Sequence, residues 1–166
     1  MTIPPTDLNL RHGVRALIFD DDDHVLLVRF QFPTATVWGL PGGGLEPDEE
    51  LLAGLRRELR EEVGLVEVAI GPHVWTREHV IPMTTGHDGQ RDQIFLVRMP
   101  RFEPDPQIGW EALRAEYVHE IRWWSLDAID EAVTSSKVLF APRRLATLAR
   151  DLLRRGPPLA AIDTGV

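Results

Sequence analysis

Two runs of apolar residues flank a short acidic stretch near the start of the chain. Residues 12–30 contain segments rich in Val, Ile and Leu on either side of four consecutive aspartates at positions 20–23. Aspartate favours turns, and runs of β-branched residues favour strands. The pattern therefore predicts a β-hairpin over residues 12–30. A calcium loop is the alternative use of the four aspartates, but the ligand spacing of such a loop is missing, which favours a solvated turn.

A helical pattern follows a loop rich in glycine and proline. Its apolar residues fall on one arc at about 100° per residue: Leu52, Leu55, Leu59 and Val63. Pro47 suits the first turn of a helix, and the acidic residues 48–50 suit the positive end of the helix dipole. Gly64 readily adopts the left-handed conformation that ends a helix. We therefore expect a helix from near Pro47 to Gly64.

The rest of the chain shows strand and helix patterns in mixed order. Apolar runs predict strands over residues 66–81, 91–99 and 120–126, and helical spacing predicts helices over residues 127–133 and 142–155. The sequence has no internal repeat and no interdomain linker. We expect one domain over residues 1–166, with an N-terminal arm at residues 1–11 and a tail at residues 156–166.

Composition narrows the class of protein. The 166 residues include 43% hydrophobic and 27% charged residues, as in ordinary soluble globular proteins. Without cysteine, the chain has no disulfide, cysteine nucleophile or thiolate metal site. The net charge of −8 argues against general affinity for nucleic acid, although a divalent cation can offset its repulsion of polyphosphate. The sequence shows no signal peptide and no bilayer-spanning run, so we expect a cytoplasmic location without a membrane partner.

Three carboxylates crowd one arc of the expected helix: Glu58, Glu61 and Glu62. Like charges four residues apart destabilise an isolated helix by about 0.2–0.5 kcal/mol, so the repulsion between Glu58 and Glu62 is locally unfavourable. A divalent cation would offset this repulsion, because Mg²⁺ is commonly held by one or two carboxylates together with substrate phosphates and water. The preceding glycines, 42–44, leave the backbone open to a metal or phosphate. A solvated helix face, with neighbouring arginines paired to the glutamates, is the alternative.

Residues 43–65 resemble the Nudix box at every specified position: Gly43, Glu49, Arg57, Glu58, Leu59, Glu61, Glu62, Gly64 and Leu65. So many coincidences are very unlikely by chance. The flanking segments WGLPGGGLEP and EIRWWSLDAI are also similar to the family, so the resemblance covers about residues 12–130. It implies an α/β fold, an α/β/α sandwich with a mixed β-sheet. It also implies a Mg²⁺- or Mn²⁺-dependent hydrolase that cleaves the diphosphate linkage of a nucleoside diphosphate joined to another group.

The same resemblance implies roles for the residues of the box. Glu58 and Glu62 would be metal ligands, and Glu61 would be a ligand or the base that activates water. The Gly42 carbonyl would be a further ligand. Arg57 would orient the glutamates. The number of metal ions stays open.

The resemblance also implies roles for residues outside this set. Glu49 would support the geometry of the helix. Several family members place an additional glutamate in a loop late in the domain, and Glu120 and Glu116 lie in the corresponding region. No motif decides between them, although Glu120 is the first choice, so the general base is Glu61, Glu116 or Glu120.

Other side chains are candidates for substrate contacts, each with an ordinary structural alternative. Aromatic rings could stack on a base or pack in the core: Phe32, Trp38 and Trp75. Arginines near strand ends could pair with phosphate oxygens or stay solvated: Arg29, Arg77 and Arg91. His79 and His119 could act as acid–base groups, although no partner spacing supports either. The small-molecule substrate stays open between nucleoside triphosphates, nucleotide sugars and dinucleotides.

Two other functions compete with hydrolysis. A Nudix-like module that senses a nucleotide without cleaving it would be expected to lose one or more of the three glutamates, and this chain keeps them all. Isomerisation, found in one branch of the family, relies on a cysteine that this chain lacks. The sequence does not distinguish a monomer from a homodimer.

Overall fold

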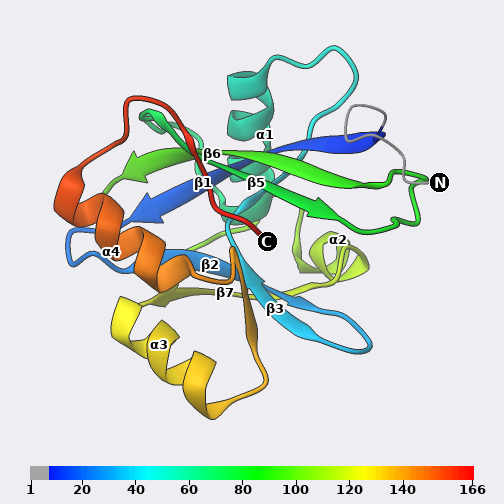
Figure 1. Cartoon of the computed structure of the whole chain (residues 1–166). Coiled ribbons are helices and arrows are strands. Elements are labelled where there is room, and N and C mark those ends of the chain that lie inside the picture. The colour runs from blue at the N-terminus through cyan, green and yellow to red at the C-terminus, as the bar shows by residue number, and fades with distance from the viewer. Residues whose placement is uncertain (1–7) are drawn as a thin grey trace.

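The computed structural model describes residues 8–166 (Figure 1). Along this part of the chain the elements are β1 (Leu10–Phe19), β2 (Val25–Gln31), β3 (Thr36–Gly39), β4 (Gly42–Gly44), α1 (Leu51–Val63), β5 (His73–Val80), β6 (Gly89–Arg98), α2 (Trp110–Ala115), β7 (Val118–Trp124), α3 (Leu126–Ser135), β8 (Leu139–Ala141), α4 (Leu145–Arg155) and β9 (Ile162–Asp163). Residues 1–7 of the expected N-terminal arm lie outside the described residues, and Leu10 and Arg11 already belong to β1. None of the described helices is long and apolar enough to cross a membrane.

β1 is the strand that joins the two halves of a mixed sheet. The strand order is β8-β3-β2-β1-β6-β5-β9, with β4 on β1 and β7 on β2. β1 runs parallel to β6 along its whole length, but it pairs with β2 only at Phe19↔Val25. The predicted hairpin therefore exists, yet its strands separate after the turn and take different partners. The mixed sheet agrees with the expected α/β class.

Two apolar clusters lie on opposite faces of β1, because successive strand residues point to opposite sides. Ala16 and Ile18 belong to the α1-side core, which also includes Leu55, Leu59 and Val63 of α1. Leu17 and Phe19 belong to the α4-side core, which also includes Ile129, Leu145, Ala149 and Leu152 from α3 and α4. Helices thus cover both sides of the sheet, with α1 on one and α3 and α4 on the other (Figure 1). This arrangement confirms the expected sandwich.

Helix α1 begins later than the sequence predicts and ends where it predicts. The expected start near Pro47 is wrong, because Asp48 has a left-handed φ of 61° that no α-helical residue adopts. The Glu49 N–H instead donates to the Glu46 carbonyl at 3.1 Å, which closes a turn. The helix ends at Gly64, whose φ is 82° and whose N–H donates to the Arg60 carbonyl.

The acidic turn of the hairpin is anchored rather than fully solvated. Asp20 is 2% exposed, and its carboxylate accepts the N–H groups of Asp22 and His24, each at 2.9 Å. The Arg101 guanidinium binds the other oxygen at 2.7–2.8 Å. Asp20 is therefore a structural residue of the turn, whereas Asp21, Asp22 and Asp23 are exposed.

Several short elements were not predicted from the sequence. The less regular stretch before β7 contains α2. The tail at residues 156–166 contains β9, which pairs with β5 at Trp75↔Ile162 and Thr76↔Asp163. The last helix starts at Leu145 rather than at residue 142, and the strand expected from residue 66 starts at His73. The tail is thus a strand of the sheet.

Candidate functional site

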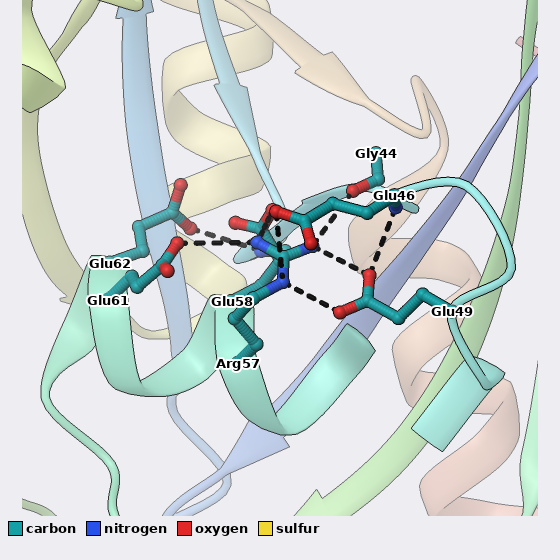
Figure 2. A network of polar contacts seen from close by, with 8 residues as sticks. Gly44, Glu46, Glu49, Arg57, Glu58, Glu61 and Glu62 are labelled. Carbon is teal, nitrogen blue, oxygen red and sulfur yellow. Dashed lines mark hydrogen bonds and ion pairs between the residues drawn. The ribbon is translucent and has the colours of Figure 1, made fainter. Parts of the chain in front are cut away.

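Helix α1 and strand β4 bring the acidic residues and the glycines together (Figure 2). Glu62, in the last turn of α1, is 4% exposed, and its Oε1 accepts the Gly42 N–H at 3.0 Å. The Glu58 carboxyl group lies against Gly43, where an added Cβ would stand 2.7 Å from the carboxyl carbon. Glycine is required there because any side chain would displace this carboxylate. The structure gives Gly42 an N–H contact with the site, and its carbonyl stays a predicted ligand.

Arg57 binds several of the box residues at once (Figure 2). Its Nε and Nη2 donate to the two oxygens of Glu49, both at 2.8 Å, and Nη2 also reaches the Gly44 carbonyl at 3.2 Å. Its Nη1 donates to Glu58 at 3.0 Å and to Glu61 at 3.3 Å. One guanidinium therefore fixes the loop before the helix and two glutamates of the helix itself.

Glu49 acts in the loop that leads into α1. Hydrogen bonds from Arg57 are the largest cause that lowers the pKa of Glu49 to about 2. The same carboxylate also accepts the Glu46 N–H at 3.0 Å. Gly54 makes room for this loop, because a Cβ at that position would stand 2.9 Å from Glu49 Oε1. The clearance that Gly54 provides thus serves the loop.

The two carboxylates nearest β4 are poorly stabilised as anions. Burial raises the pKa of Glu62 to about 8, although the Gly42 N–H and the Arg15 guanidinium favour the charged form. Burial also raises the pKa of Glu58, against the opposing effect of Arg57. Like charges add to both effects, because Glu61 raises the pKa of Glu58 and Glu58 raises the pKa of Glu62. A nearby cation would stabilise the charged form of both.

This donor set fits a hard divalent cation. Glu58 and Glu62 offer carboxylate oxygens on one helix face, next to the backbone of Gly42 and Gly43. Within residues 8–166, no three acidic or imidazole side chains converge into a preformed metal cage. Such a cage is not needed for Mg²⁺, which usually keeps several water ligands and takes one or two carboxylates from the protein.

The two late glutamates occupy different surroundings. Glu120, on β7, is paired with Arg29 at 3.3 Å and with Arg122 at 3.2 Å. Glu116, between α2 and β7, makes no ion pair with any of residues 8–166, and its charge contributes to the raised pKa of Glu62. This electrostatic effect on Glu62 favours Glu116 over Glu120 for a role near the acidic residues of α1.

The aromatic candidates for base stacking separate into buried and accessible rings. Trp38 and Trp75 are 2% and 1% exposed and belong to the α4-side core, so neither offers a free face. Phe32 is 37% exposed and packs between Phe30 and Tyr117, with centroid distances of 6.0 and 5.3 Å. Of the three rings, Phe32 alone is exposed enough to contact a base.

The remaining charged candidates also lie in different surroundings. Arg29 is bound to Glu120, and Arg91 is exposed on β6 with Glu78 at 4.0 Å. His119 is exposed on β7. Arg77 and His79 lie on the face of β5 that continues from the α4-side core.

Sequence analysis did not single out Arg15, which adjoins the acidic residues. It is paired in register with Gly42 and bonded to Asp92 at 2.9 Å. Burial lowers the pKa of Arg15, but Asp92 and Glu62 outweigh that effect and raise it. The available signal was a charged residue inside the apolar strand VRALIF.

Comparisons with known proteins agree with this fold. The family model of the NUDIX domain matches residues 9–143. The nucleoside triphosphatase NudI of Escherichia fergusonii is 42% identical over 62 residues, which cover 36% of this chain and 43% of that protein. The match therefore spans less than half the length of such curated relatives.

Solved structures extend the comparison over most of the chain. The NUDIX domain of Shewanella oneidensis NrtR, complexed with ADP ribose, is 25% identical, with a TM-score of 0.63, and the match covers 92% of this chain and 94% of that one. The MutT protein from Methanosarcina mazei Go1 has the same TM-score at 22% identity, with 89% of this chain and 96% of that chain covered. The second likeness concerns the fold.

Proposed function

Because the chain belongs to the NUDIX family, we propose that it is a hydrolase that cleaves the diphosphate linkage of a nucleoside diphosphate joined to another group. One observation carries the proposal: Glu62 is a buried carboxylate whose pKa burial raises to about 8 despite the Gly42 N–H and Arg15, and it stands one helical turn from Glu58 beside the glycines of β4. Such an arrangement is unfavourable for folding alone and favourable for holding a divalent cation.

Each residue of the site has its own role in the proposed reaction. Glu58 and Glu62 hold Mg²⁺ or Mn²⁺ through their carboxylate oxygens, with the Gly42 carbonyl as a further ligand. Arg57 orients Glu58 and Glu61 through the contacts described above. The bound cation supplies charge neutralisation at the phosphates and lowers the pKa of water.

A carboxylate must also take the proton of the attacking water. Glu61 and Glu116 are the two candidates, because Glu61 is held beside Glu58 by Arg57 and Glu116 acts electrostatically on Glu62. Glu120 is occupied by Arg29 and Arg122 and is the less suitable base. Comparing Glu61→Gln with Glu116→Gln distinguishes the two candidates. Loss of the base lowers kcat and changes KM little, so the variant with this effect identifies the base.

The substrate belongs to the nucleotides. A nucleoside triphosphate is favoured, because curated relatives that match part of this chain at 38–42% identity are nucleoside triphosphatases. A nucleoside diphosphate sugar such as ADP ribose is the second candidate, because a structure covering most of this chain is complexed with that compound. A panel of both classes with Mg²⁺ distinguishes them by the products released.

The test of the proposed function is loss of product release in Glu62→Gln. This variant keeps the shape of the side chain and the acceptor for the Gly42 N–H, but it removes the charge that holds the cation. Glu50→Gln is the matched control, because Glu50 is exposed at the start of the same helix and caps nothing with its side chain. Full hydrolysis by Glu62→Gln would refute the proposal. Nucleotide binding without any product release, by the wild type, would instead identify the sensing module.

A further inference from the structure

One face of strands β1, β5 and β6 changes from apolar to charged along its length. Residues directly opposite each other in a sheet share a face, so the register identifies its members. The apolar half, Leu17, Trp75 and Ile94, belongs to the α4-side core. The continuation of the same face carries polar and charged side chains: Arg11, Arg15, Arg77, His79, Gln90 and Asp92. We call this continuation the arginine face.

Positive charge exceeds negative charge on the arginine face. Its one carboxylate, Asp92, is 1% exposed and already accepts two hydrogen bonds, from Arg15 Nε at 2.9 Å and from Gln90 Nε2 at 2.7 Å. Gln90 in turn accepts a hydrogen bond from Arg11 at 3.2 Å. Asp92 is therefore engaged by Arg15, and the positive charge of Arg77, opposite it in the register, is left in excess.

Arg77 carries a buried hydrogen-bond donor on this face. Among the described residues, its Nε is a buried nitrogen with no hydrogen-bond partner. Burial lowers the pKa of Arg77, and the positive charges of Arg15 and Arg143 lower it further, against the opposing effect of Asp92. A buried donor without an acceptor is unfavourable in a folded protein. An anion that entered this face would supply the missing acceptor.

The arginine face adjoins the acidic residues of α1. Arg15 is paired with Gly42 in the register of β1 and β4, and the Gly42 N–H binds Glu62. The charge of Arg15 also acts on both Glu58 and Glu62. A polyphosphate substrate that reached the cation at Glu58 and Glu62 would therefore extend past Arg15 toward Arg77.

We propose that Arg77 is a specificity-determining residue that binds a phosphate group of the substrate, next to the phosphate held through the cation at Glu58 and Glu62. The inference rests on the proposed function for the nature of the substrate, and it adds that the substrate is a polyphosphate bound at two adjacent positions. The guanidinium suits this role, because its planar donors match the geometry of phosphate oxygens. Arg15 supplies charge nearby, while Asp92 keeps it in place.

Direct binding of a polyphosphate without metal tests the role of Arg77 separately from hydrolysis. Inorganic tripolyphosphate is titrated into the full chain in EDTA by isothermal calorimetry. Arg77→Gln should bind about tenfold more weakly than the wild type, which corresponds to about 1.4 kcal/mol. Arg98→Gln is the matched control, because Arg98 is exposed at the far end of β6 and pairs with Asp23; its affinity should equal that of the wild type.

Two results would overturn the role of Arg77: no binding of tripolyphosphate by the wild type, or equal affinity of Arg77→Gln and the wild type. Failure of the proposed function gives a different result. If the wild type hydrolyses no nucleotide but Arg77→Gln still binds tripolyphosphate more weakly than the wild type, the anion site is supported and the proposed hydrolase activity is rejected.

A structural role for Arg77 predicts another outcome. Arg77→Met removes the buried unpaired nitrogen and keeps much of the apolar stem, so its thermal midpoint should equal or exceed that of the wild type. A clear fall in the midpoint, with unchanged tripolyphosphate affinity, would make Arg77 a residue of the fold and reject the inference.

Discussion

Asp20 shows how a single buried carboxylate can serve the fold. Burial raises the pKa of Asp20, but the N–H groups of His24 and Asp22 and the Arg101 guanidinium together lower it below the ordinary value of 3.8. A lowered pKa means that the folded state binds protons less readily than the unfolded state. Asp20 thus contributes stability at pH values above about 3.8, and this contribution is lost as the pH falls below it.

The variant Asp20→Asn tests this sign. Its free energy of unfolding at pH 7 should lie about 1–3 kcal/mol below that of the wild type, because two backbone N–H groups and Arg101 lose a charged acceptor. The difference should shrink as the pH falls through 4 toward 2, as measured by urea unfolding. Asp21→Asn, at the exposed neighbour, should show no such pH-dependent difference. A constant difference across this range would contradict the assignment.

At the scale of single residues, the sequence predicted which residues form the site better than it predicted the surroundings of other charged residues. The glutamates and Arg57 were found because the box fixes their spacing, and the structure brings them together. Asp20 and Arg77 were expected at the surface, because a charged side chain is usually solvated. Asp20 is instead buried and Arg77 half-buried, and their surroundings depend on residues far along the chain, such as Arg101 for Asp20, which no local pattern reveals.

At the scale of elements, the start of α1 depends on the backbone of Asp48. This residue has a φ of 61°, a conformation that costs less for glycine than for residues with a Cβ. Asp48 is exposed, so its side chain adds little packing. We therefore expect Asp48→Gly to be more stable than Asp48→Ala by about 1 kcal/mol.

Urea midpoints of these two variants measure the difference directly. An ordinary helical position would give the opposite order, because alanine is favoured over glycine inside a helix by about 1 kcal/mol. Alanine more stable than glycine at residue 48 would therefore restore the helix start near Pro47 that the sequence suggested.

Long elements were predictable and short ones were not. The periodicity of α1 and α4 spans several turns, whereas β4 is three glycines, a residue type that strands disfavour. β4 is a strand only because β1 lies beside it at Gly13↔Gly44 through Arg15↔Gly42. β8 and β9 likewise take their conformation from β3 and β5. Tertiary pairing, and not local preference, makes these elements.

At the scale of the whole molecule, the order of strands was beyond the reach of local patterns. β1 and β6 are parallel neighbours although five elements separate them along the chain. The resemblance to a known family predicted a mixed sheet between helices, and periodicity alone did not. The pairing of β4 with the same strand β1 places the glycines of β4 beside α1, so the site exists only in the assembled fold.

A site made by the assembled fold should couple cation binding to global stability. Mg²⁺ or Mn²⁺ would bind the folded chain, where Glu58 and Glu62 lie beside β4, and would bind the unfolded chain weakly. At a concentration about 100 times Kd, a ligand that binds only the folded state stabilises it by about 2.7 kcal/mol. We therefore expect either cation to raise the thermal midpoint and excess EDTA to reverse the rise.

The variant Glu62→Gln separates this coupling from a general salt effect. It should be at least as stable as the wild type in EDTA, because it removes a buried charge, yet it should gain little from Mg²⁺. Glu50→Gln, on the exposed start of α1, should respond to the cation as the wild type does. Equal rises in all three proteins would mean that the cation acts on the surface charge of −8 as a whole and not at Glu58 and Glu62.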